Sequence, residues 1–135
     1  MQPVLARCGY RCDLCLAYRP NVQKDPSNQQ VLSDGWYKYF GFRIPPEQIL
    51  CDGCLSADSK TIDQNCLVRP CVIAKGLNNC AGCEDYACEN LRDRLVVYEE
   101  MAAKFADPIP QEDRRLFILP YENKQRLENL RAANQ

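Results

Sequence analysis

The sequence predicts a small α-rich domain of three to four helices and irregular loops, stapled together through its cysteines. Ten of its 135 residues are cysteine and none is histidine. Three cysteine pairs have the spacing Cys-x-x-Cys, and apolar residues repeat at helical intervals in only a few segments. Cysteine at this density in a short chain indicates either a disulfide framework or metal ligation.

The cellular compartment bears on this choice, because disulfides persist only in oxidising surroundings. Residues 1–9 contain no basic region and no apolar stretch of the length that a signal peptide needs. Nowhere does the chain contain the run of about 18 apolar residues that a membrane span requires. We therefore expect a cytoplasmic protein whose cysteines are reduced.

The spacing of the cysteines favours metal ligation. The three close pairs are Cys12/Cys15, Cys51/Cys54 and Cys80/Cys83. This separation lets two sulfurs of one tight turn point at one ion, whereas structural disulfides usually close longer loops. Gly53 and Gly82 stand third in the last two pairs, and we expect both to adopt the positive φ of a turn whose N–H groups face thiolate.

The cysteines fall into two groups of five. The first group is Cys8, Cys12, Cys15, Cys51 and Cys54, and the second is Cys66, Cys71, Cys80, Cys83 and Cys88. With no histidine in the chain, four thiolates around one zinc ion form the ordinary closed structural site. The sequence therefore predicts two zinc ions per chain, each held by four-cysteine knuckles that staple the domain.

Spacing assigns these ligands only in part. In the first group we expect zinc on Cys12, Cys15, Cys51 and Cys54. Cys8, one helical turn before Cys12, either replaces one of these four or lies beside the site. In the second group the Cys80/Cys83 pair needs two more ligands, to be drawn from Cys66, Cys71 and Cys88, and spacing does not select them.

Two other functions stay open, and neither comes with predicted catalytic residues. An iron–sulfur cluster also takes four thiolates, and Cys8-x3-Cys12-x2-Cys15 matches the cluster spacing of radical enzymes that use S-adenosylmethionine. Those enzymes are much longer, and Leu14 stands where an aromatic residue is usual. An iron–sulfur electron-transfer or thiol redox-sensing protein is the first alternative. A small enzyme with a metal-activated thiolate is the second, since the absence of histidine excludes Ser-His-Asp and Cys-His catalysis.

The charge pattern bears on partners. Seventeen basic and eighteen acidic residues give a formal net charge of −1, and the basic residues are scattered along the chain. Nucleic-acid binding needs a concentrated basic face, so we do not expect it. The leading expectation is a module with structural zinc whose surface binds another protein. The sequence does not indicate an oligomeric state.

Apolar spacing predicts the helices. Leu32, Trp36 and Tyr39 predict a helix over about residues 26–40, with both aromatic residues in the core and Gly41 at its end. A short helix is expected from Pro70 to Lys75, followed by Gly76.

Two more helices are expected in the second half of the chain. One is a continuous helix whose apolar stripe is Leu91, Leu95, Tyr98, Ala102 and Phe105, ended by the prolines at 108 and 110. The last starts near Pro120 and carries Leu127 and Leu130. We expect a single cysteine-rich domain over residues 1–135, with residues from about 91 to 135 forming a helical tail packed on it.

A resemblance adds to this interpretation. The motifs that carry it are, in order, Cys8-Gly9-Tyr10-Arg11-Cys12-Asp13-Leu14-Cys15, Cys51-Asp52-Gly53-Cys54, Cys66-x4-Cys71 and Asn79-Cys80-Ala81-Gly82-Cys83-x4-Cys88. They resemble the bacterial and archaeal cysteine-rich family known as domain of unknown function 3795. The similarity covers roughly residues 5 to 95, and Pro120-Tyr121-Glu122 resembles that family's tail. The resemblance implies a prokaryotic, zinc-binding protein and no established activity.

Overall fold

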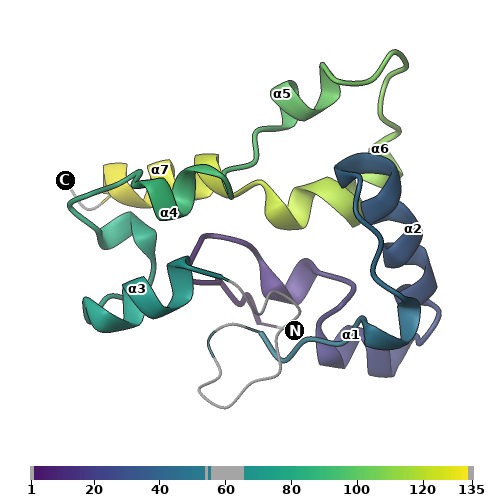
Figure 1. The fold of residues 1–135 in the computed structure, drawn as a ribbon, viewed down its shortest axis with the longest axis horizontal. Helices are drawn as coiled ribbons and strands as arrows, with labels where there is room; N and C mark the ends of the chain where they lie inside the picture. The colour runs from purple at the N-terminus through teal and green to yellow at the C-terminus, as the bar shows by residue number, and fades with distance from the viewer. Residues whose placement is uncertain (1, 54, 56–65, 134–135) are drawn as a thin grey trace.

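The computed structural model describes residues 2–53, 55 and 66–133, and in these ranges the chain is helical without a sheet (Figure 1). The only β-pairing in these ranges consists of two isolated β-bridges, between Leu5 and Arg11 and between Tyr18 and Cys51. The predicted α-rich class is therefore confirmed. Cys54, a predicted zinc ligand, lies outside the described residues.

The helices are shorter and more numerous than the three or four that the sequence predicts. They are α1 (Arg19–Lys24), α2 (Asn28–Phe40), α3 (Val68–Ala74), α4 (Glu89–Arg92), α5 (Tyr98–Ala102), α6 (Gln111–Asp113) and α7 (Asn123–Ala133). Tight helical turns join them, among them a π turn over Arg114–Ile118. Only α2 and α7 exceed seven residues, so packing between segments must hold the rest in place.

Helix α2 forms where the apolar spacing predicts it. Gly41 ends it with a φ of 80° and donates to the carbonyls of Trp36 and Tyr37. Trp36 and Tyr39 are buried, which confirms their predicted place in the core. The helix packs closely because Gly35 has no side chain: a Cβ at Gly35 would lie 2.2 Å from the ring of Phe117.

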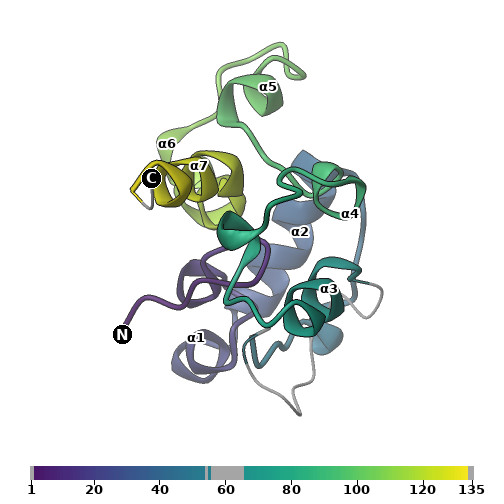
Figure 2. The same ribbon diagram turned by 90° about the vertical axis from the view of Figure 1, so that its left-hand side faces the viewer.

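The continuous helix predicted after Cys88 is wrong, because the chain forms α4 and α5 with a non-helical segment between them. The two helices bury their apolar residues in different places. Leu91 of α4 belongs to one hydrophobic cluster and Met101 of α5 to another. In both overall views α5 lies at the edge of the molecule (Figures 1 and 2).

A buried asparagine explains the break. The side chain of Asn123, fully buried, accepts a hydrogen bond from the Val96 N–H at 2.8 Å and donates to the Arg94 carbonyl at 3.0 Å. A continuous helix would bond both backbone groups internally. A residue 27 positions away therefore replaces part of the helical hydrogen bonding.

The other two predicted helices are shifted. Helix α3 begins at Val68, so Pro70 lies two residues inside it, and Gly76 follows its end with a φ of 68° as predicted. The last helix, α7, begins at Asn123 rather than near Pro120, and it buries Leu127 completely.

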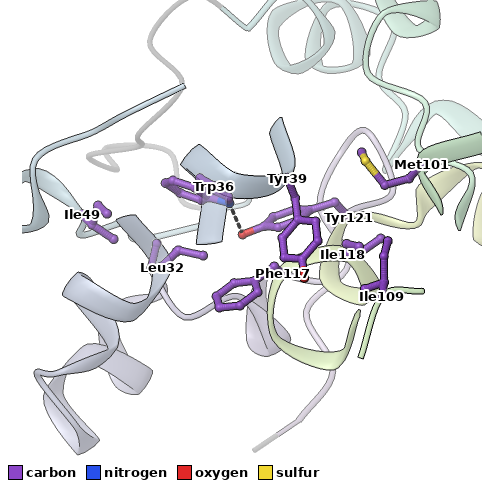
Figure 3. Close-up of a cluster of buried hydrophobic side chains, with 10 residues drawn as sticks. Leu32, Trp36, Tyr39, Ile49, Met101, Ile109, Phe117, Ile118 and Tyr121 are labelled. Atoms are coloured by element: carbon purple, nitrogen blue, oxygen red, sulfur yellow. Dashed lines mark hydrogen bonds between the residues drawn. The ribbon is translucent and has the colours of Figure 1, made fainter. Parts of the chain in front are cut away.

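Two hydrophobic clusters form the core. The first lies between α2 and the turns of residues 109–121, and its buried members are Ala17, Leu32, Trp36, Tyr39, Ile49, Met101, Ile109, Phe117, Ile118 and Tyr121 (Figure 3). The second consists of Ala6, Cys8, Val68, Val72, Cys80, Ala81, Leu91 and Leu127. The N-terminal segment therefore contributes to both clusters, with Ala6 in one and Ala17 in the other.

Within the described ranges, no helix has the length and apolar character needed to cross a membrane.

Candidate metal centres

Four cysteines of the second group line one small cavity of about 10 Å³. Cys71 comes from α3, Cys80 and Cys83 come from a 3-10 turn, and Cys88 caps the start of α4. A cavity of this size holds about one water-sized particle. Cysteines from three separate elements of the fold therefore border one small cavity.

The turn between Cys80 and Cys83 is built differently from the predicted one. Gly82 is part of a 3-10 turn and does not adopt a positive φ, so that prediction is wrong. Asn79 stabilises the turn instead, because its side-chain oxygen accepts the Ala81 N–H at 2.9 Å. The Cys83 N–H then donates to the Cys80 carbonyl at 3.1 Å, and both residues line the small cavity.

The electrostatic surroundings of Cys80 show how closely the second group is gathered. Burial, and after it the nearby Cys88, Cys83, Cys71 and Cys66, together raise the pKa of the Cys80 thiol to about 12. Lys75 provides a counter-charge at the edge of this group: its Nζ donates to the Cys83 Sγ at 3.0 Å and to Asp85 at 3.0 Å.

The first group contains the glycine turn that the sequence predicts. Gly53 has a φ of 86°, and its N–H points at the Cys51 Sγ at 3.4 Å. A Cβ at Gly53 would lie 3.8 Å from the Cys12 Sγ, so the two parts of the predicted site lie side by side. The Cys51 N–H donates to the Ala17 carbonyl at 2.8 Å, which anchors the turn beside the Cys12/Cys15 segment.

Cys15 completes this arrangement among the described residues. The pKa of its thiol is raised to about 11, because burial and, to a smaller extent, the nearby Cys51 raise the pKa by more than the hydrogen bond to Tyr121 lowers it. The Tyr121 hydroxyl is 3.0 Å from the Cys15 Sγ.

The first group also borders a second, larger cavity of about 300 Å³. Its cysteine lining is Cys8, Cys12, Cys15, Cys51 and Cys66. Cys66 therefore borders this cavity rather than the small one, although it contributes to the raised pKa of Cys80.

Side chains beyond position 120 form hydrogen bonds with the backbone of both cysteine groups. Asn123 donates to the Cys8 carbonyl at 2.7 Å, and Arg131 donates to the carbonyls of Cys83 at 2.8 Å and Ala81 at 3.1 Å. The sequence predicts no role beside the cysteines for either residue, and none for Lys75 beyond the end of a helix. Local spacing carries no signal for a contact made from so far along the chain.

The arrangement fits zinc in the kind and number of donors. The nine described cysteines are all free of disulfides. However, no three or more Cys, Asp or Glu side chains within residues 2–53, 55 and 66–133 are grouped so that they could hold one ion. To meet the Zn–S distance of about 2.3 Å around one ion, the thiols would have to lie closer together than they do in this structure.

These features define the class of the molecule as a small, cysteine-rich, α-helical protein. The family model described as "Protein of unknown function (DUF3795)" matches residues 4–93, and the chain belongs to this family. A search of curated proteins found no match. No solved structure matches either.

Proposed function

We propose that this protein binds metal through cysteine thiolates at two centres, and that zinc is the metal at both. The observation that carries the proposal is the small cavity lined by Cys71, Cys80, Cys83 and Cys88. Four cysteines around one ion make the closed structural zinc site, and no histidine competes for a place.

This proposal selects the two ligands that spacing leaves open. Cys71 and Cys88 join Cys80 and Cys83, and Cys66 is surplus. The Lys75 ammonium group supports Cys83 as a ligand, because a hydrogen bond to its sulfur stabilises a thiolate from outside the coordination sphere. Four thiolates on a divalent ion carry a net charge of −2, which a neighbouring cation partly offsets.

The first centre rests on the approach of Cys12, Cys15 and Cys51, with Cys54 as the fourth proposed ligand. The Gly53 N–H directed at the Cys51 sulfur is the contact that supports it. In this proposal Cys8 is surplus. Both metals are structural, and the binding of another protein stays a prediction.

Elemental analysis of reduced protein purified without air tests the proposal, with two zinc ions per chain as the expected result. Cys71→Ser and Cys88→Ser should each lose one zinc, whereas the matched variant Cys66→Ser should keep both. If Cys66→Ser loses a zinc and Cys88→Ser does not, the ligand assignment is wrong. Protein without any bound metal would refute the proposal as a whole.

One observation favours a second candidate, an iron–sulfur protein that transfers electrons or senses redox state. Five cysteines border the larger cavity, and a cluster takes four thiolates. The same measurement distinguishes the candidates, because an iron–sulfur protein is brown and contains iron and acid-labile sulfide, whereas zinc–thiolate protein is colourless.

A further inference from the structure

Cys83 is held at its N–H, its carbonyl and its sulfur. Its N–H donates to the Cys80 carbonyl at 3.1 Å. Its carbonyl accepts a hydrogen bond from Arg131 at 2.8 Å, and its sulfur accepts one from the Lys75 ammonium group at 3.0 Å. Cys83 is also buried, with 7% of its surface exposed. Two cationic side chains therefore fix this residue, one at its backbone and one at its sulfur.

Lys75 links two segments that carry proposed metal ligands. It comes directly after α3, and its backbone N–H donates to the Cys71 carbonyl at 3.1 Å. Its side chain borders the small cavity and donates to the Cys83 sulfur. One residue thus connects the helix that carries Cys71 with the turn that carries Cys83.

Arg131 fixes the same turn from the C-terminal helix α7. Besides the Cys83 carbonyl it bonds the Ala81 carbonyl at 3.1 Å, and its guanidinium carbon lies 4.5 Å from the centre of the Tyr86 ring. Tyr86 lies between Cys83 and Cys88 in the sequence. Arg131 therefore contacts the segment that supplies three of the four proposed ligands.

The charges of these two side chains suit a thiolate centre. Four thiolates on a divalent ion carry a net charge of −2, and Lys75 and Arg131 contribute one positive charge each. Asp85 also accepts a hydrogen bond from Lys75 at 3.0 Å, but its side chain is 74% exposed, so solvent screens this carboxylate.

The four cysteines of the small cavity differ in their access to solvent. Cys80 and Cys83 are buried, whereas Cys71 and Cys88 are half-buried. The thiolate is the nucleophile in cysteine chemistry, and a sulfur lone pair that accepts a charged hydrogen bond is less available for attack. Burial and the contact with Lys75 therefore both protect the Cys83 sulfur.

We propose that Lys75 and Arg131 are positioning residues of the second centre and that they make Cys83 its protected ligand. Electrophiles then react first at Cys71 or Cys88, so the loss of metal from this centre begins at those sulfurs. In each reaction a carbon–sulfur bond forms while the bond to the leaving group breaks, and the leaving group departs with its electron pair. This inference rests on the proposed zinc function and adds how one of its centres is regulated.

Cadmium-113 NMR of reduced, full-length protein loaded with cadmium tests the positioning. We expect one resonance per centre, and the resonance that changes in Cys71→Ser belongs to the second centre. Lys75→Met should shift this resonance alone and weaken zinc binding at this centre by about tenfold. Lys75→Arg, which keeps a charged donor, should recover most of the affinity. Lys104→Met, at an exposed position after α5, is the matched control and should change neither resonance.

Arg131→Gln tests the contact from the C-terminal helix. It should also weaken zinc binding at the second centre by about tenfold, since it frees the backbone of the turn. Arg115→Gln is its control, because Arg115 is exposed and pairs with Glu112. Circular dichroism of the loaded variants identifies any loss of fold, and Lys75→Met, changed at an exposed position, decides the matter if Arg131→Gln unfolds.

Alkylation by iodoacetamide tests the order of attack. Mass spectrometry of zinc-loaded protein that carries a single acetamide group identifies the first sulfur of the second centre to react. We expect Cys71 or Cys88 in the parent protein, and an increased share of Cys83 in Lys75→Met.

Two results would overturn the inference while the metal-binding function stands. One is a pair of cadmium resonances that Lys75→Met leaves unchanged, with unchanged zinc affinity. The other is alkylation of the second centre that starts at Cys83 in the parent protein. Protein that binds neither cadmium nor zinc would instead refute the proposed function, and the inference with it.

Discussion

The Tyr121 hydroxyl lies 3.0 Å from the Cys15 sulfur and also accepts the Trp36 indole N–H at 3.2 Å. Because the indole can only donate, the tyrosine proton is left to be donated to the sulfur. Figure 3 shows the bond between the two aromatic side chains within the first cluster. A residue of the C-terminal region thus connects the packing of the core to a proposed metal ligand.

Removing this hydroxyl should destabilise the protein. Tyr121→Phe keeps the ring contacts but leaves the buried Trp36 N–H without an acceptor, which should lower the free energy of unfolding by about 1–3 kcal/mol. Urea unfolding followed by circular dichroism measures the change. Tyr37→Phe is the control, because the Tyr37 side chain is more than half exposed. Equal stabilities of the two variants would show that the Tyr121 hydroxyl contributes nothing.

The contact between Gly35 and Phe117 predicts a steric effect. A methyl group at Gly35 would overlap the Phe117 ring, so Gly35→Ala should destabilise the protein by about 1–3 kcal/mol despite the better helix propensity of alanine. Thermal unfolding checks this. The double variant Gly35→Ala/Phe117→Leu should recover part of the loss relative to Phe117→Leu alone, and strictly additive effects would contradict the overlap.

The two glycines of the cysteine turns should respond differently to alanine. Gly53→Ala forces a side chain into the left-handed region, which costs about 1–2 kcal/mol, and its Cβ would lie 3.2 Å from the Tyr18 ring. Gly82→Ala places a methyl group 3.5 Å from Leu77, which is ordinary contact. We expect Gly53→Ala to lower both the melting temperature and zinc retention, and Gly82→Ala to change neither by much. A more damaging Gly82→Ala would contradict the observed backbone.

Asn123 should be among the least replaceable polar residues. Its amide bonds the Val96 N–H and the carbonyls of Cys8 and Arg94, so Asn123→Ala leaves three backbone groups without these partners. The loss should be about 2–4 kcal/mol, less than three full penalties of about 1–3 kcal/mol each, because two of the three bonds are only partly buried. Amide hydrogen exchange at Val96 should accelerate in the variant. Asn129→Ala on the exposed face of α7 is the control, and similar exchange in the two variants would be the contrary result.

Metal removal should unfold at least the region around the small cavity. Helices α3 and α4 have seven and four residues, too short to be stable alone. Structural zinc contributes about 10–16 kcal/mol of apparent binding energy, against a typical domain stability of about 5–15 kcal/mol. Circular dichroism of reduced protein treated with a chelator should lose its cooperative melting transition. Retention of the transition would show that the core folds without metal.

Local patterns in the sequence were sufficient to predict some of the structural features. Helix α2, its end at Gly41 and the burial of Trp36 and Tyr39 follow from apolar spacing and from the one residue that adopts positive φ freely. The turn at Gly53 follows from the same property. These features depend on residues that are close in the sequence. The local sequence can therefore specify them whatever the path of the rest of the chain.

The remaining features depend on contacts between distant segments. The break between α4 and α5 depends on Asn123, and the turn at Gly82 takes its shape from the Asn79 cap rather than from glycine. Spacing alone leaves the partners of Cys80 and Cys83 open, because Cys66, Cys71 and Cys88 can all reach them along the chain. The ten cysteines by themselves predict binding of metal through thiolates. Which thiols share a cavity was decided only by tertiary packing, because α3 and the start of α4 bring Cys71 and Cys88 to the small cavity while Cys66 faces the larger one.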